Sequence, residues 1–318
     1  MTISTNKTEN QKKLTALIIQ EFLSNHPYCQ PLGSNYVNTL KPVLPPQLKN
    51  VNLSNSSMSQ ISLHPVLLSI LCGTIFGDSS LTIPKNYTNA RLQCRHSTRQ
   101  TEWFMWKSLC VFYVFTNSTN ITMGIDFQQP DGYQAKTEKI GGEMLGKWHY
   151  QSAVNVQLTA LCNIVCPSNK KEYKRSWLNH MNAYFLMTLW LDDGSLSKGR
   201  QGVISCNDRP AKEAQILVDY IFTVWGVKCS VTALPSKSTS TNPNPVEITI
   251  DDFANLEKFI SIIAPIVPVR SMLYKVCLYL NDISFLQRWI SYLKSIFPAS
   301  WHNDIDKYYA YMGSIDLN

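Results

Sequence analysis

Two aspartates, Asp78 and Asp193, each follow an apolar segment, and they lie 115 residues apart. They close the stretches LCGTIFGD at 71–78 and LMTLWLDD at 186–193. A carboxylate at the carboxyl end of a helix meets the negative end of the helix dipole, which is unfavourable unless a cation offsets it. Two such carboxylates brought together suit a hard divalent cation such as Mg²⁺, which activates water and stabilises charge on a phosphate. For either acid alone, a solvated helix cap is the alternative interpretation.

The segments that precede these acids are expected to be helices that cross closely. SLHPVLLSILCGTIFGD at 62–78 has helical periodicity, with Pro65 at a typical first helical position and with Gly73 and Gly77 inside. Each internal glycine costs about 1 kcal/mol relative to alanine, a cost that is accepted where another backbone must come close. NAYFLMTLWLDDGSL at 182–196 is a second segment of the same kind. A crossing of the two would bring both acids to one place.

The 115-residue spacing indicates an internal repeat of about one small domain. After the first motif, strands are expected at 89–97, 121–127 and 152–161, with a helix at 101–115. After the second, strands are expected at 201–208, 228–235 and 246–251, with helices at 210–226 and 253–264. The sequence therefore divides into a polar extension at 1–60, a first half at 61–176, a second half at 177–280 and a helical tail at 281–318.

These motifs carry a family resemblance. LCGTIFGDSS at 71–80, LMTLWLDDGS at 186–195 and VPVRSMLYK at 267–275 resemble the signatures of LAGLIDADG homing endonucleases, although Thr188 stands where a small residue is common. The chain is most similar to the single-chain, two-motif type encoded in organellar group I introns. The resemblance covers about 61–280 and implies an α+β fold, a pseudo-twofold tandem αββαββα arrangement with two saddle-shaped antiparallel sheets and a two-helix interface.

The resemblance also implies a chemistry. Asp78 and Asp193 would bind Mg²⁺ (or Mn²⁺), and Lys275 and Lys171 would assist catalysis, with Lys170 as the alternative to Lys171. The chain would act as a monomeric pseudo-dimer on double-stranded DNA at an intron insertion site and hydrolyse both strands, which promotes intron mobility. The expected location is an organelle, mitochondrion or plastid, in which the gene itself is carried.

Alternation in the predicted strands suggests which side chains face DNA. Arg91, Gln93 and Arg95 share one strand face while Leu92 and Cys94 take the other. Arg and Gln are side chains that read guanine and adenine in the major groove. Further base-reading candidates are Asn155, Gln157, Gln201, Ser205 and Asn207, and candidates for phosphate contacts are Lys198, Arg200, Arg209 and Lys228.

The charge balance fits a polyanionic partner but is uneven. Lys plus Arg number 29 against 22 Asp plus Glu, a net charge of +7. Residues 61–176 hold 12 basic and 7 acidic residues, whereas 177–318 hold 12 and 13, so the second half has a weak electrostatic footprint for DNA. The best candidate for a membrane-spanning stretch, at 259–269, is interrupted by Pro265 and Pro268, so no membrane partner is expected.

Two other functions compete with DNA cleavage. A protein of this fold can act as an RNA maturase that binds its intron RNA and assists splicing, and an inactive copy would fold and bind weakly. The presence of both acids favours retained cleavage, because a descendant that only binds RNA does not need them.

Overall fold

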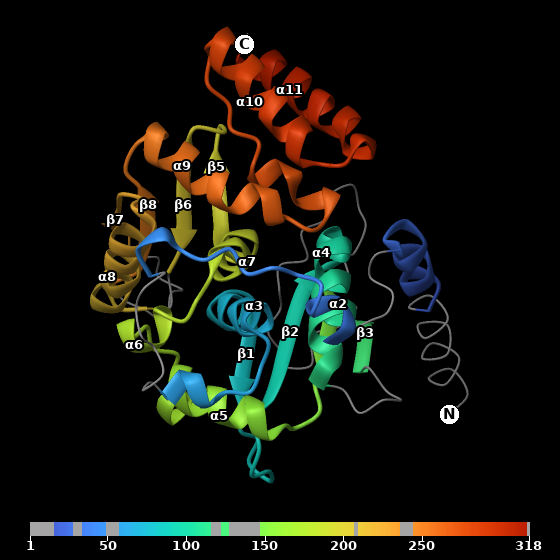
Figure 1. The fold of residues 1–318 in the computed structure, drawn as a ribbon, viewed down its shortest axis with the longest axis vertical. Helices are drawn as coiled ribbons and strands as arrows, with labels where there is room; N and C mark the ends of the chain where they lie inside the picture. Colours follow the sequence, from blue (N-terminus) through green and yellow to red (C-terminus); the bar gives the residue numbers. More distant parts are fainter. Residues whose placement is uncertain are drawn as a thin grey trace. The chain divides into compact units, whose positions relative to one another are not determined.

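A computed structural model describes residues 16–27, 34–48, 57–115, 122–126, 147–206, 209–235 and 244–316 (Figure 1). The chain separates into two compact units. The first unit comprises residues 1–41 and 78–169, and the second comprises 42–77 and 170–318. None of the described helices is long and apolar enough to cross a membrane.

The first unit is built on one antiparallel sheet of four strands in the order β1-β2-β4-β3. The strands are β1 Ser79–Thr82, β2 Arg91–Ser97, β3 Thr122–Asp126 and β4 Lys147–Gln151. In β2 the burial alternates as expected, with Leu92, Cys94 and His96 in the core. The register pairs Ser79 with Cys94, and His96 with Trp148. This register places the end of β2 beside the start of β1.

The first unit also contains helical elements, some of which pack on this sheet. Residues 16–25 are helical, and the other helical elements are α2 Ser34–Val37, η4 Thr98–Gln100, α4 Thr101–Met105, η5 Trp106–Val111, η6 Phe112–Phe115, α5 Val156–Val165 and η7 Pro167–Asn169. α4 contacts β2, and α5 contacts β1 and β2. Stacked aromatic rings form the core, with Trp103 on Trp106 and Phe104 on Trp148.

The expected strand at 152–161 is wrong, because this segment forms helix α5. Asn155 is the N-cap residue, and its side chain accepts a hydrogen bond from the backbone N–H of Gln157. The buried residues that follow have helical spacing: Leu158, Leu161, Cys162 and Val165. The alternation at 152–159 came from a short polar stretch at a helix start, and the fourth strand is β4 instead.

The second unit contains both motif helices, α3 Pro65–Phe76 and α7 Ala183–Asp193. α3 groups with this unit because it packs along α7 (Figure 1). The expectation that Pro65 is the first helical residue is confirmed. α3 is buried on all sides from Val66 to Phe76, as its predominantly apolar sequence requires.

The sheet of the second unit repeats the strand order of the first, as β5-β6-β8-β7. Its strands are β5 Gly194–Ser197, β6 Gln201–Ser205, β7 Cys229–Ala233 and β8 Val246–Ile250. Helices α8 Ala211–Tyr220 and α9 Phe253–Ile263 pack on it. Along the chain each half therefore runs αββαββα, which confirms the α+β tandem fold.

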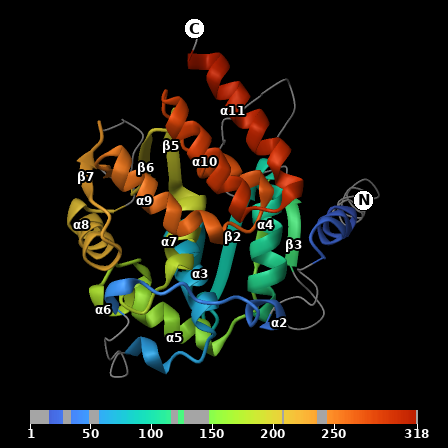
Figure 2. The ribbon, with the colours of Figure 1, turned by 45° about the horizontal axis from the view of Figure 1, so that its top comes forward.

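Shorter elements and a helical hairpin complete the second unit. The short elements are η2 Pro46–Leu48, η3 Ser57–Gln60, α6 Arg175–Leu178, η8 Ile221–Trp225, η9 Ala264–Ile266, η10 Arg270–Lys275 and η11 Ala299–Trp301. The expected helical tail is α10 Ile283–Ile296 and α11 His302–Asp316, which lie side by side (Figure 2). The hydroxyl of Tyr309 anchors α11 by donating to the carbonyl oxygen of Leu278 at 2.9 Å.

Candidate active site

The two motif helices touch where α3 carries glycine and α7 carries a side chain. A Cβ added at Gly73 would lie 2.7 Å from both the carbonyl oxygen of Phe185 and Cβ of Thr188. A Cβ added at Gly77 would lie 2.5 Å from Cβ of Asp192. Real Cβ atoms do not approach so closely, so only glycine fits at either position of this crossing. The expected close approach of these helices is confirmed.

Asp192 also lies at this crossing, although the sequence motifs did not identify it as a site residue. It is 8% exposed, and its Oδ2 accepts a hydrogen bond of 2.8 Å from the hydroxyl of Thr74 on α3. The 115-residue offset aligns Asp192 with Gly77, so its side chain fills the space that the glycine leaves. The second motif ends in two consecutive aspartates, and only the second of them, Asp193, aligns with Asp78.

Asp193, the predicted metal ligand, is the last residue of α7 and is half-buried. It occupies the position that Asp78 has after the first motif. Its assignment as a ligand remains a prediction. The adjacent Asp192 gives the second motif two carboxylates at the carboxyl end of one helix.

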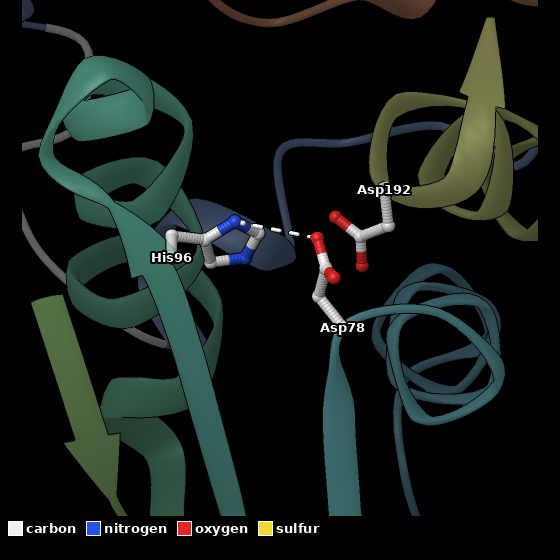
Figure 3. Close-up of side chains that lie close together, drawn as sticks. All are labelled: Asp78, His96 and Asp192. Atoms are coloured by element: carbon white, nitrogen blue, oxygen red, sulfur yellow. Dashed lines mark ion pairs between the residues drawn. The ribbon is translucent and has the colours of Figure 1, made fainter. Parts of the chain in front are cut away.

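In the first unit, Asp78 lies between the end of α3 and the start of β1. Its side chain is 36% exposed, and its Oδ2 lies 3.5 Å from Nδ1 of His96, whose side chain is fully buried (Figure 3). His96 is the second-to-last residue of strand β2, which the sheet register brings beside β1. Sequence reasoning missed His96 because 18 residues and a strand pairing separate it from Asp78.

Lys275, the predicted catalytic lysine, is buried at the carboxyl end of α7. Its ammonium donates to the carbonyl oxygens of Leu191 at 2.5 Å, Asp192 at 3.3 Å and Trp190 at 3.4 Å. The indole N–H of Trp190 donates back to the carbonyl oxygen of Lys275 at 2.8 Å. A positive charge here offsets the negative end of the α7 dipole. The structure thus supplies the cation that an acid at this helix end requires.

The first-half lysines lie in the turn after η7. Lys170 is exposed and Lys171 is half-buried. The role of Lys171 remains a prediction.

Arg209 is not at the surface, so the expectation of a phosphate contact is wrong. It is 3% exposed, and its guanidinium donates to the carbonyl oxygen of Phe76 at 3.2 Å. The same group lies over the rings of Phe76, at 4.6 Å, and Tyr173, at 4.9 Å. Arg209 therefore places a positive charge at the carboxyl end of α3, as Lys275 does at the carboxyl end of α7. It also makes cation–π contacts with aromatic rings.

The predicted DNA-facing residues divide into three groups. Those that the structure places on a solvent-accessible strand face or turn are Arg91, Gln93, Arg95, Lys198, Arg200, Gln201, Ser205 and Lys228. Asn155 and Gln157 lie at the start of α5, so the expectation that they line a strand face is wrong. Asn207 lies outside the described residues. Within the first group, the amide of Gln93 donates to Oε1 of Gln151 on β4 at 2.9 Å, which orients it along the sheet.

One family model and one solved structure agree with this architecture. The homing endonuclease I-WcaI bound to its DNA recognition sequence has a similar fold, with a TM-score of 0.54 and 18% identity over 73% of this chain and 95% of that chain. The N-terminal LAGLIDADG domain of DUF199/WhiA gives a TM-score of 0.38 and 10% identity, over 74% of this chain and 93% of that one. No curated protein matches the chain. The model of the LAGLIDADG DNA endonuclease family matches residues 68–241, more than half of the chain, and the chain belongs to that family.

Proposed function

We propose that this protein is a site-specific endonuclease that uses a divalent metal to hydrolyse both strands of a long DNA target. The observation that carries the proposal is the α3–α7 crossing, where Gly77 packs on Asp192. Asp78 is the next residue after Gly77, and Asp193 is the next after Asp192. Along the chain, Asp78 and Asp193 are therefore each one residue away from the residues that form this crossing.

The donor chemistry of these residues fits a hard cation. Asp78, Asp192 and Asp193 offer carboxylate oxygens, the ligands that Mg²⁺ and Mn²⁺ prefer, and Asp78 is open to solvent. We assign Asp78 and Asp193 as the metal-holding pair because they occupy equivalent motif positions, with Asp192 as a further candidate. Bound there, the metal would activate water and stabilise charge on the scissile phosphate.

The lysines would complete the chemistry through charge. The ammonium of Lys275 is fixed against the last turn of α7, which ends at Asp193. A fixed cation close to the metal ligands adds electrostatic stabilisation where negative charge develops on phosphate. We assign Lys171 the corresponding role in the first half.

The DNA partner is proposed by analogy with the homing endonuclease I-WcaI, whose structure is of the protein bound to its DNA recognition sequence. Arg91, Gln93 and Arg95 on β2, with Gln201 and Ser205 on β6, are long or polar side chains suited to base edges. Lys198, Arg200 and Lys228 are exposed cations suited to phosphates. Lys198 and Gly199 form the β5–β6 turn with positive φ angles of 48° and 70°, which places Lys198 at a hairpin tip.

Intron mobility and an organellar location follow from the resemblance to intron-encoded, two-motif members, and both belong to this proposal. The balance of 12 basic and 13 acidic residues over 177–318 favours neither cleavage nor the maturase alternative, and it supports only an inactive copy. A weak net charge lowers the expected affinity for any nucleic acid, so only an assay can separate the two functions.

The test is cleavage of a plasmid that carries the joined, intronless exons of the host gene. The wild-type protein should linearise the plasmid with Mg²⁺ and leave it intact with EDTA. Asp193→Asn should reduce the rate by about 10³-fold, since a ligand that supports several kcal/mol of transition-state stabilisation is lost. If the folded wild-type protein cuts nothing under varied salt and metal but binds the intron transcript, the endonuclease proposal fails and the maturase takes its place.

A further inference from the structure

The imidazole of His96 is fixed inside the first unit by the residues around it. The ring is fully buried, and it meets the ring of Phe104 edge-on at 6.0 Å between centroids. Phe104 in turn stacks on Trp148 at 5.5 Å, and Trp148 pairs with His96 in the β2–β4 register. The indole N–H of Trp148 donates to the hydroxyl of Thr101 at 2.8 Å. A ring held by such a core keeps one orientation.

The hydrogen-bond partner of this ring favours one of its tautomers. Nδ1 of His96 is 3.0 Å from Oε1 of Gln100, and an amide oxygen can only accept. In the tautomer that donates to this oxygen, Nδ1 carries the hydrogen, and this same N–H lies 3.5 Å from Oδ2 of Asp78. The dipole of the N–H attracts the carboxylate (Figure 3).

His96 is thus a buried hydrogen-bond donor that contacts a solvent-exposed acid, Asp78. The His96 side chain is 0% exposed and that of Asp78 is 36% exposed. Carboxylates that bind metals are typically oriented by such outer partners, and loss of a partner typically costs 10–100-fold in metal affinity or activity. In the tautomer that donates to Gln100, Nδ1 of His96 acts on the carboxylate and has no lone pair to offer a metal.

The second half has no histidine at the equivalent place. Ser79, the residue after Asp78, pairs with Cys94, and Gly194, the residue after Asp193, pairs with Ile204. Two residues further along the chain, His96 therefore corresponds to Cys206, which directly follows β6 and is also buried. The two halves thus differ in the group that lies behind the predicted ligand.

We infer that His96 is a positioning residue, which holds the Asp78 carboxylate in the orientation that binds the divalent cation. The inference rests on the proposed function, since it concerns the same metal-binding acid. It also makes the first half chemically unlike the second.

The test measures metal binding by the full-length protein without DNA. Mn²⁺ is titrated in and the free ion is followed by electron paramagnetic resonance, with Asp78→Asn identifying the binding that depends on that acid. His96→Leu should raise the dissociation constant of this binding by about tenfold or more. His96→Asn, whose amide N–H can take the place of Nδ1–H, should restore most of the affinity. The matched control is Cys206→Ala, which should bind like the wild type.

Two outcomes overturn the inference. One is an absence of Asp78-dependent Mn²⁺ binding in the wild type, and the other is wild-type affinity in a folded His96→Leu protein. Since leucine in place of a buried histidine can unfold the chain, Gln100→Leu is measured as well. It keeps the ring and leaves Oδ2 of Asp78 as an acceptor for Nδ1–H, so the affinity should stay close to that of the wild type; a tenfold loss in this variant would also overturn the inference, because the ring alone would then not hold Asp78.

These results are separable from the fate of the proposed function. A wild-type protein that binds Mn²⁺ through Asp78 and His96 but cuts no DNA contradicts the endonuclease and leaves the role of His96 intact. A wild-type protein that cuts DNA, combined with unaffected Mn²⁺ binding in the folded His96→Leu variant, contradicts the role of His96 alone.

Discussion

The two motif helices occupy equivalent places in a repeated fold, yet they contribute unequally to their crossing. Where α3 has Gly73 and Gly77, α7 has Thr188 and Asp192 at the aligned positions. At both contact points α3 supplies the space and α7 fills it. The repeat therefore preserves the close contact of the two helix backbones, but the side chains at this contact are not symmetric.

The cations at the helix ends are unequal as well. Lys275 caps α7 through three carbonyl oxygens, while Arg209 caps α3 through one carbonyl oxygen and two aromatic rings. Both residues come from the second half of the sequence. The sequence repeat thus predicts that each helix end needs a cation, but it does not predict where the cation comes from.

The largest loss of stability is expected when a larger side chain replaces a glycine of α3 at its crossing with α7. Gly73→Val should lower the free energy of unfolding by about 3 kcal/mol or more, because the new side chain meets the carbonyl oxygen of Phe185 and the side chain of Thr188. Thr188→Ala, the aligned change on α7, should cost only about 1 kcal/mol. Urea denaturation measures both. Equal costs would contradict the unequal roles of the two helices.

The next largest loss of stability is expected when Lys275 or Arg209, the two cations at the helix ends, is replaced. Lys275→Met should destabilise the protein by about 2–3 kcal/mol, since a buried charged donor with three acceptors is lost. Arg209→Met should cost about 1–2 kcal/mol, because one hydrogen bond and the ring contacts are lost. The comparison uses thermal unfolding of both variants in the same buffer. A larger loss of stability in Arg209→Met than in Lys275→Met would contradict the expected order of the two contributions.

A smaller difference is expected at the amino ends of the helices. Asn182 caps α7 by accepting from the N–H of Tyr184, and its amide donates to the carbonyl oxygen of Pro65 at 3.1 Å, so it ties α7 to α3. Asn182→Ala should cost about 2 kcal/mol, the upper range for loss of an N-cap. The measurement is the midpoint of chemical denaturation. A cost below that of the His64 variant described next would show that the tie to α3 contributes nothing.

The smallest effect, and a pH-dependent one, is expected at His64. Its Nδ1 accepts from the N–H of Val66 at 3.3 Å as the cap of α3, which requires the neutral ring. Partial burial lowers the pKa of His64, so the folded state favours the neutral form. The unfolded state then binds more protons, and this stabilisation is present above the ordinary pKa of about 6.5 and is lost as the pH falls below it. The difference in stability between wild type and His64→Ala should shrink between pH 7.5 and pH 5; a constant difference would contradict the cap.

Sequence reasoning went furthest where one segment determines its own structure. The helix from Pro65, the acid-terminated α7 and the alternation of β2 all follow from local patterns. It failed at 152–161, where apparent alternation lay over a helix start whose cap is Asn155. Arg209 and His96 could not be placed, because their partners are set by packing and by strand register. The distinct positions of Asp192 and Asp193 likewise depend on how α7 rotates against Gly77.

The most direct test of the account is cleavage of the exon-junction DNA by Asp78→Asn and Asp193→Asn side by side, each confirmed as folded by circular dichroism. If the acids of both motifs hold the metal, each variant should lose Mg²⁺-dependent cleavage by about 10³-fold while it still binds the target. Cleavage at the wild-type rate by either variant would contradict the claim that the ends of α3 and α7 form the active site.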